Sequence, residues 1–292
     1  MRAAVLGATG FIGSALVPAL AEHADVVAVS RRGDADTNVN VDAVAADVSD
    51  ATSVRAALDG VDVLYYLVHS LGAPDYVALD RRAAENVARE AERAGVKQIV
   101  YLGGLGDDRG DLSEHLRSRA ETAAALATGN VPVTTLRAAV VVGRGSAGFE
   151  TIVALVDRLP AMVAPKWISS PTQPIALADI VRYLAEVGGR PEAIGESFDV
   201  GGPEVLTYKQ MIERIARLRG RRPLIVEVPI LSPRLSSYWL HLVTPVRASV
   251  ARPLVEGLRN ATTAQDERIR ELCPFPLTPF DEAAREALAP RS

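Results

Sequence analysis

The sequence predicts an α/β fold, a doubly wound parallel sheet with helices on both of its faces. Three observations predict it. Apolar segments of strand character alternate with helical segments over residues 1–228, which is the pattern of a parallel sheet. Several of the apolar segments run directly into glycine, and a regularly spaced glycine turn separates the first strand from the first helix.

The first strand, over 2–6, leads into a turn with the spacing Gly-x-x-Gly-x-x-Gly. We expect Gly7 to make the tight turn, Gly10 to let backbone approach a pyrophosphate, and Gly13 to let the helix pack closely on the strand. A second apolar strand, over 26–29, follows the helix. Phosphate at the start of this helix is stabilised by free N–H groups and by the helix dipole. This order predicts a Rossmann unit that binds a dinucleotide; a tight turn without a ligand is the alternative.

The end of the second strand indicates which dinucleotide binds. NAD-binding folds place Asp or Glu there, whereas NADP needs a cation for its 2′-phosphate. The residues here are Ser30, Arg31 and Arg32, and Asp34 follows only after a glycine, in a predicted loop. A guanidinium pairs bidentately with phosphate and stays charged at any working pH. The sequence therefore predicts NADP(H), with two solvated arginines as the alternative.

A third strand, over 41–46, is followed by Asp47 and Val48, where contacts to adenine are expected, and Ser49 or Asp50 begins the next helix. Ligands of an open α/β sheet bind beyond the carboxyl ends of its strands. The exits of the later strands should therefore line the same crevice as the glycine turn.

A fourth strand, over 61–68, is almost continuously apolar, as expected for a central strand buried on both faces. It exits into His69. A long helix over 74–94 and a fifth strand over 96–102 follow, and that strand runs into Gly103.

The rest of the chain is predicted to build the substrate side. We assign residues 1–145 to the NADP(H)-binding core, and 146–292 to a smaller substrate-side region, interleaved with the core, and a helical tail. Over 232–250 the apolar spacing suits one helix face, which could be a lid, a dimer surface or a membrane-surface helix. The other predicted elements, in chain order, are a helix from Asp111 or Ser113 to 129, a strand over 131–142, a helix over 146–159, a proline-rich connection over 160–174, a strand over 174–177, a helix to 190, a strand over 196–200, a helix capped by Thr207, a strand over 224–228 and a helix over 281–288.

The composition excludes several classes of protein. Of 292 residues, 48% are hydrophobic and 23% charged, so the chain can bury a large core. A net charge of −4 gives no field that attracts nucleic acid. No segment approaches the roughly 18 apolar residues of a membrane span, and the single cysteine, Cys273, fits a reducing compartment. We expect a cytoplasmic protein with a small-molecule substrate, no metal, no nucleic-acid partner and no stable membrane insertion; a homodimer stays open.

Several separated segments resemble one family, the short-chain dehydrogenase/reductases in their extended and atypical branches, and most closely the NmrA-like NAD(P)H-binding proteins. The resemblance covers about residues 1–220 and implies an oxidoreductase or a non-catalytic NADP(H)-binding redox sensor or assembly factor. The segments are 7–13 (GATGFIG), 47–48, 96–102, 134–137 (TTLR), 174–179 (PIALAD), 198–202 (FDVGG) and 204–208 (EVLTY), with the runs LVHSLG, SEHLRSRAET and LRAAVVVGRGSAGFE.

The sequence departs from this family where its chemistry is done. Active members use a Ser after the fifth strand and a Tyr-x-x-x-Lys on the next helix, where Tyr is the acid. Here the strand ends in two glycines, and His115 and Arg119 stand in place of Tyr and Lys. Their four-residue spacing puts them on one helix face. A histidine with a pKa near ~6.5 can donate a proton at neutral pH, so His115, Arg119 and His69 are the catalytic candidates.

Two functions stay open. One is an NADPH-dependent oxidoreductase that reduces a small hydrophobic carbonyl, enone or quinone, and the other is the non-catalytic sensor. In both, the expected cofactor contacts are Gly7, Thr9, Gly10, Phe11, Ile12, Gly13, Ser30, Arg31, Arg32, Asp47, Val48, Leu67, Val68, His69 and Gly103.

Overall fold

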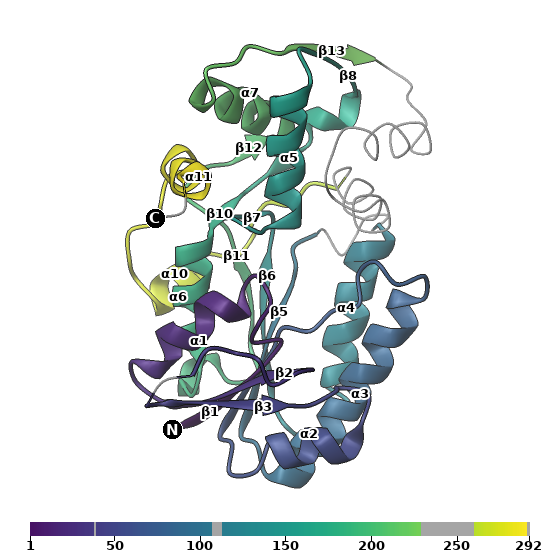
Figure 1. Ribbon diagram of the computed structural model, residues 1–292, viewed down its shortest axis with the longest axis vertical. Helices are drawn as coiled ribbons and strands as arrows, with labels where there is room; N and C mark the ends of the chain where they lie inside the picture. The colour runs from purple at the N-terminus through teal and green to yellow at the C-terminus, as the bar shows by residue number, and fades with distance from the viewer. Residues whose placement is uncertain (38, 107–112, 229–259, 291–292) are drawn as a thin grey trace.

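The computed structural model describes residues 1–37, 39–106, 113–228 and 260–290 (Figure 1). Its centre is a seven-stranded sheet with the strand order β11-β6-β5-β4-β1-β2-β3, and every neighbouring pair in it is parallel. The strands are β1 (Arg2–Leu6), β2 (Asp25–Ser30), β3 (Val41–Ala45), β4 (Val63–Tyr66), β5 (Gln98–Gly104), β6 (Val133–Ala138) and β11 (Ser197–Val200). The predicted parallel α/β sheet is confirmed.

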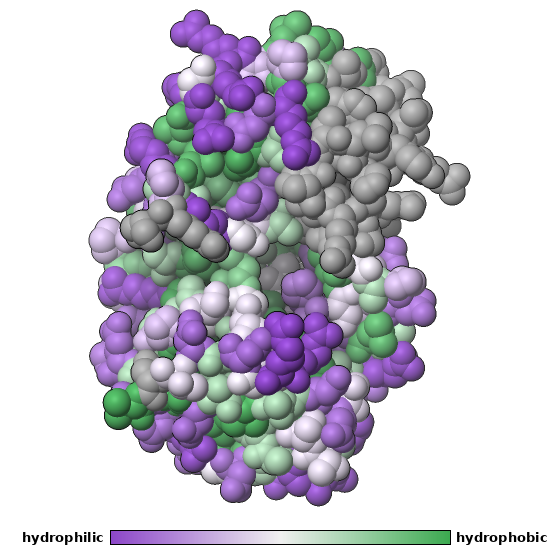
Figure 2. All heavy atoms as spheres, in the orientation of Figure 1, coloured by the Kyte–Doolittle hydropathy of each residue, from purple (hydrophilic) through white to green (hydrophobic). Residues whose placement is uncertain are grey.

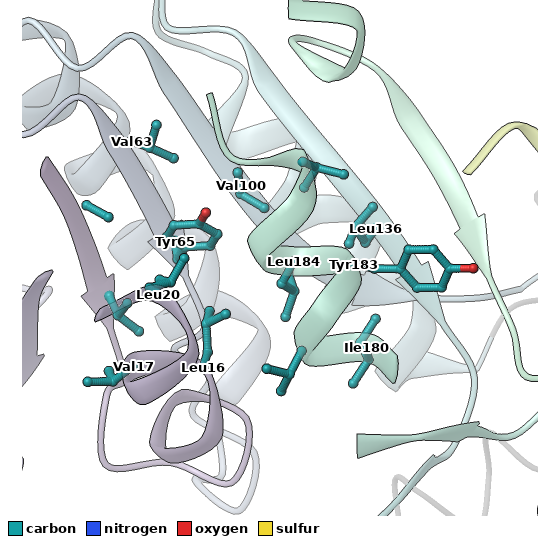
Figure 3. Packing of buried hydrophobic residues seen from close by; sticks show 14 of the residues in the cluster. Leu16, Val17, Leu20, Val63, Tyr65, Val100, Leu136, Ile180, Tyr183 and Leu184 are labelled. Carbon is teal, nitrogen blue, oxygen red and sulfur yellow. The ribbon is translucent and has the colours of Figure 1, made fainter. Parts of the chain in front are cut away.

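Helices cover both faces of the sheet, as a doubly wound fold requires. On one face α1 (Gly13–Ala21) packs against α6 (Leu177–Val187). Figure 3 shows Leu16 and Leu20 of α1 on one side of Tyr65 and Leu184 of α6 on the other. The opposite face carries α2 (Ala51–Ala57), α3 (Tyr76–Ala94) and α4 (Glu114–Leu126), over a separate apolar core (Figure 1).

Local sequence signals fix the ends of the helices. The Asp50 carboxylate accepts the N–H groups of Thr52 and Ser53 at the start of α2, and the Ser113 hydroxyl accepts the N–H of Leu116 at the start of α4. Gly95 ends α3 in the left-handed region, with φ +74°, where a side chain would be strained. These caps lie where the sequence predicts them.

The strand predicted over 131–142 is divided in two. The chain leaves the main sheet after Ala138 because its neighbours end there: Ala138 pairs with Gly104 on one side and with Val200 on the other. It then forms β7 (Val141–Val142), which pairs with β10 (Ile175–Ala176) in a small separate sheet.

The connection predicted over 160–174 is more ordered than its prolines suggest. Pro165 is the last residue of β8 and Pro171 the first of β9, the strand ends where proline is tolerated. Two small sheets result, one pairing β8 with β13 and the other pairing β9 with β12. The bounds are β8 (Ala161–Pro165), η1 (Lys166–Ser169), β9 (Pro171–Thr172), β12 (Leu206–Thr207) and β13 (Leu224–Val228).

A third apolar cluster joins the elements beyond the main sheet, including Phe149, Met211 and Phe280. The short helix α10 was not predicted, and the helix predicted over 232–250 lies outside the described residues. The elements are α5 (Ala147–Arg158), η2 (Pro191–Ala193), α7 (Tyr208–Leu218), α10 (Arg268–Leu272) and α11 (Phe280–Leu288). β11 and α6 follow residue 145, yet they belong to the main sheet and to the helix layer that covers it. The division of the chain into two regions near residue 145 stays a prediction.

Candidate functional site

The glycine turn lies at the carboxyl end of β1 and joins it to α1. Gly7 has φ +91° and donates its N–H to Val29 O at 3.0 Å. A Cβ at Gly13 would lie 2.2 Å from Gly7 O, and one at Gly10 would lie 3.1 Å from the same oxygen. The helix therefore starts so close to the strand that Gly13 must be a glycine, while Gly10 keeps the surface of the turn bare.

The start of α1 can receive an anion. Its N-cap position is Ile12, which makes no side-chain cap within the described part of the chain. The first N–H groups of a helix have no partner inside the helix, and with the helix dipole they favour a phosphate. The N–H groups of Gly10 and Ser14 are used within the turn, on Gly7 O and Gly10 O at 2.9 Å each, so a pyrophosphate would bind the other N–H groups of the helix start.

The exit of β2 forms a hollow of about 330 Å³ lined by Thr9, Ser30, Arg31, Arg32 and Asp34. Asp34 is the residue that sequence reasoning missed. Its carboxylate accepts the Ser30 hydroxyl at 2.7 Å and the Arg32 Nε–H at 2.7 Å. These bonds, Ser30 first, hold the pKa of Asp34 below its usual range. Figure 2 shows strongly hydrophilic residues gathered where β2 and β3 lie in Figure 1.

In the sequence, Gly33 is the feature that indicates that Asp34 could lie near the end of β2. Gly33 has φ +64° and turns the chain so that the carboxylate faces Ser30. The hollow consequently carries both the cations predicted to bind a 2′-phosphate and an anion beside them.

Asp47 stands at the exit of β3 as predicted, and its side chain is partly occupied. Its Oδ1 accepts the N–H and the hydroxyl of Ser49 at 2.8 and 2.7 Å. These bonds lower the pKa of Asp47, and the positive charge of Arg31 lowers it further. The carbonyl of Val48 accepts the Asn86 amide at 2.8 Å. A turn and a neighbouring helix thus hold this loop in place.

The exit of β4 lies directly beside the glycine turn. The N–H of Leu67 donates to Leu6 O at 3.0 Å, and a Cβ at Gly7 would lie 3.1 Å from Leu67 O and 3.5 Å from Val68 Cγ2. The predicted contacts Leu67, Val68 and His69 therefore continue the crevice away from β1.

His69, His115 and Arg119 act on one another electrostatically, His69 from the exit of β4 and the other two from α4. Desolvation by the surrounding protein is the main reason that the pKa of His69 falls to about 4, and the charge of Arg119 adds to it. Desolvation also lowers the pKa of His115 to about 3, with further contributions from Arg119 and His69. By surface area the His69 side chain is exposed and His115 is half-buried.

Both imidazoles are therefore neutral at pH 7, which changes the role predicted for His115. A proton donor needs a pKa near the working pH, and the sequence argument took the ordinary value. A neutral imidazole can still donate its N–H to a substrate oxygen. Leu71 N–H donates to His69 Nδ1 at 3.3 Å, so the proton of neutral His69 is on Nε2.

Two glycines end β5, where active members of the family have a Ser, and side chains pack closely around both. A Cβ at Gly104 would lie 2.9 Å from Leu116 Cδ2, and one at Gly103 would lie 3.2 Å from Tyr101 Cε1. Leu116 of α4 thus lies where a side chain at Gly104 would stand, and Tyr101 of β5 lies close to where one at Gly103 would stand. A cavity of about 210 Å³ lies beside them, with Arg119 in its lining.

Two tyrosines near the strand exits, Tyr101 and Tyr76, are buried. Tyr101 is 1% exposed and donates its hydroxyl to Arg119 O at 3.2 Å, so it belongs to the core. Tyr76 is 6% exposed at the start of α3. Neither presents a free hydroxyl to the crevice.

The glycine turn at the carboxyl edge of a parallel sheet defines a dinucleotide-binding fold. Comparison with known proteins agrees, because residues 7–150 match the family described as NAD(P)H-binding. Residues 7–150 are thus an NAD(P)H-binding domain of this family, and the predicted nicotinamide cofactor is confirmed at that level.

The curated relatives match this chain over very different shares of their length. Uncharacterised proteins of Mycobacterium bovis and Mycobacterium tuberculosis are 33% identical over 102 residues, which cover 35% of this chain and 12% of theirs. The (4-alkanoyl-5-oxo-2,5-dihydrofuran-3-yl)methyl phosphate reductase of Streptomyces griseus is 24% identical over 287 residues, 97% of this chain and 96% of its own.

Solved structures share the whole fold. An NADPH-dependent quinone oxidoreductase of Escherichia coli, complexed with NADPH, has a TM-score of 0.77 at 20% identity and covers 99% of this chain and 100% of its own. The triphenylmethane reductase of a Citrobacter species, complexed with NADP(H), has a TM-score of 0.74 at 20% identity, covering 98% and 100%. These likenesses show the fold.

Within the described residues, none of the helices combines the length and the apolar character needed to cross a membrane. The same residues hold no group of three or more His, Cys, Asp and Glu side chains that could bind a metal ion.

Proposed function

We propose that this protein is an NADPH-dependent reductase of quinones or enones, compounds whose carbonyl is conjugated. One observation carries the proposal: Arg119 of α4 lines a cavity of about 210 Å³ at the end of β5, and its charge acts on His69 at the exit of β4 and on His115 of α4. Bound NADPH would supply a hydride. The residues named here would bind and stabilise the acceptor.

The electrostatics favour conjugated acceptors over isolated carbonyls. Reduction of an isolated ketone produces an alkoxide, which needs a proton from a nearby acid, and neither histidine is protonated at pH 7. Hydride addition to a quinone produces a phenolate, whose conjugate acid has a pKa near ~10, and addition to an enone produces an enolate. The guanidinium of Arg119 and an imidazole N–H can stabilise such an oxyanion until water protonates it.

The relatives support this class of reaction. The Streptomyces griseus protein is named as a reductase of an oxo-dihydrofuran that carries an alkanoyl group. The Escherichia coli protein with the same fold is named as a quinone oxidoreductase. Both names describe reductions of conjugated oxygen compounds, which is the chemistry proposed for this crevice.

We also propose that the cofactor is NADPH rather than NADH. Arg31 and Arg32 line the hollow at the exit of β2, and a 2′-phosphate would pair with them. Asp34 lies beside Arg32 at 2.7 Å, where it orients the guanidinium and also opposes an incoming anion. Its effect on affinity is therefore a direct test of where the 2′-phosphate lies.

The second candidate function is a non-catalytic NADP(H)-binding sensor or assembly factor. The absence of the family's Ser, Tyr and Lys favours it, because Gly103, His115 and Arg119 replace or displace them. A cytoplasmic location, a homodimer and a substrate-side region beyond residue 145 remain proposals under either function.

The test is NADPH consumption with a panel of acceptors. Purified protein is mixed with NADPH and with quinones, enones or simple aldehydes, and absorbance at the nicotinamide band is followed. We expect turnover with quinones or enones and little with aldehydes. Tight NADPH binding without turnover on any acceptor would instead support the sensor.

A further inference from the structure

A buried carboxylate on α3 has no part in the mechanism above. Asp80 is 4% exposed, and its Oδ1 accepts the N–H of Ser70 at 2.6 Å. Burying a carboxylate costs free energy unless hydrogen bonds or charges compensate. Burial accordingly raises the pKa of Asp80, while the Ser70 bonds and the charge of Arg119 lower it.

The bond that Asp80 accepts fixes one particular loop. Ser70 directly follows His69, and the next residue, Leu71, donates its N–H to His69 Nδ1 at 3.3 Å. Asp80 and Leu71 thus hold the same three-residue turn, one from the helix and one from within the turn. Ala73 N–H also donates to Ser70 O at 2.9 Å, which closes the turn after His69, while the Asp80 bond ties the turn to α3.

We propose that Asp80 is the positioning residue for His69: by binding Ser70 N–H it holds the loop so that Leu71 N–H stays on Nδ1 and Nε2–H faces the crevice. This inference rests on the proposed function for its consequence in turnover. The orientation of the imidazole itself can be measured without any reaction.

The charge of Arg119 connects Asp80 to the same site. This charge lowers the pKa of Asp80, of His69 and of His115, so each of these three groups lies within electrostatic reach of Arg119. A carboxylate here partly balances the guanidinium while the helix keeps it away from solvent. Asp80 is therefore placed so that it can hold the loop of His69 in position from the side of α3.

The chain offers a matched control on the same helix. Glu90 is also buried, 0% exposed, and pairs with Arg55 at 2.7 Å and Arg93 at 2.6 Å. Removing its charge disturbs a buried carboxylate of α3 without touching the loop at 69–71. Effects common to Asp80 and Glu90 variants are structural, and effects confined to Asp80 report positioning.

The first experiment reads the His69 tautomer by ¹⁵N NMR of the histidine side chains in the full chain, with His69→Gln to assign its signals. Wild type should show the Nε2–H form. Asp80→Asn keeps an oxygen that can accept Ser70 N–H, so its His69 signals should match wild type, as should those of Glu90→Gln. Asp80→Ala should show a mixture of tautomers. Asp80→Leu, which leaves less of a cavity, serves if Asp80→Ala does not fold.

The second experiment uses turnover on the best acceptor. Partners that orient metal-ligating histidines contribute about 10–100-fold. We expect the same range here, so Asp80→Ala should lower kcat by that factor with little change in KM for NADPH, and Asp80→Asn should restore most of it. Adding His69→Gln to Asp80→Ala should cost nothing further. Unchanged His69 signals in Asp80→Ala, or additive losses in the double variant, would overturn the inference. If wild type turns nothing over, the proposed function fails while the NMR result still decides on Asp80.

Discussion

The two ends of the crevice differ in the groups that form them, which are mainly backbone at one end and mainly side chains at the other. Near β1 and β2 the site is mainly backbone: a glycine turn in which a Cβ at Gly13 would lie 2.2 Å from Gly7 O, and a helix start without a side-chain cap in the described residues. Near β4 and α4 it is mainly side chains, where the charge of Arg119 lowers the pKa of both His69 and His115. Backbone sites bind a ligand that many proteins share, whereas side-chain sites set the chemistry.

The largest effect on NADPH binding is expected from a substitution in the glycine turn. Gly10→Val puts a branched Cβ where the pyrophosphate would lie, so NADPH binding should be lost, more than about 100-fold. The nearest contact of that Cβ is Gly7 O at 3.1 Å, so the chain should stay folded. Titration of protein fluorescence with NADPH and circular dichroism check the two statements.

Gly60→Ala serves as the control for Gly10→Val. Gly60 has positive φ, +67°, and a Cβ there meets nothing within 4 Å; it lies far from the glycine turn in sequence. The Gly60→Ala variant should be somewhat less stable than wild type and should bind NADPH with the same affinity. A folded Gly10→Val variant that binds NADPH like wild type would show that the turn serves packing only.

The next effect concerns the cations at the exit of β2. Replacing Arg31 and Arg32 together with Ala should remove most of an at least tenfold preference for NADPH over NADH, because one charge-assisted phosphate contact contributes about 1.4 kcal/mol or more. Calorimetric titration with both dinucleotides measures it. Equal wild-type affinities would contradict the assignment of the 2′-phosphate to this hollow.

A smaller effect of opposite sign is expected at Asp34. Asp34→Asn removes an anion that lies 2.7 Å from Arg32 and keeps the size of the side chain. NADPH affinity should rise about threefold, roughly 0.6 kcal/mol, and NADH affinity should change less. A loss of NADPH affinity would mean that Asp34 binds ribose hydroxyls instead.

The side-chain end should make stability depend on pH. The folded pKa values of His69 and His115, about 4 and about 3, lie below the ordinary value of 6.5. Between these values the unfolded chain binds more protons, so stability is fully present above pH 6.5 and falls as the pH drops toward 4. The Tm should therefore fall on acidification, and a His69→Gln, His115→Gln double variant should show a shallower decrease. An identical decrease of Tm in wild type and in the double variant would show that His69 and His115 do not cause it.

The sequence predicts the backbone end well and the side-chain end only in part. Regular apolar runs and the glycine spacing predict β1–β5, and Ser113 and Asp50 cap helices as expected, because these signals are local. The return of Asp34 to Ser30 depends on one glycine torsion, and the β8–β13 pair is hidden by prolines at strand ends.

The catalytic candidates show the same limit. His115 and Arg119 could be paired from their spacing on one helix, and His69 could be placed at a strand exit. Their shifted pKa values could not be predicted, because desolvation depends on how the strand exit and the helix pack together. That difference changes the expected role of His115 from proton donor to hydrogen-bond donor.

The most direct test of the account is the pH profile of quinone reduction by NADPH, measured between pH 5.5 and 8 for wild type and His115→Ala. Because both histidines are neutral over this range, wild-type kcat should stay nearly flat, and His115→Ala should lower it about 10²–10³-fold, the usual contribution of one oxyanion donor, with NADPH affinity nearly unchanged. A wild-type rate that falls about tenfold per pH unit above 6.5 would show that a protonated histidine is needed, and full activity in His115→Ala would remove this residue from the reaction.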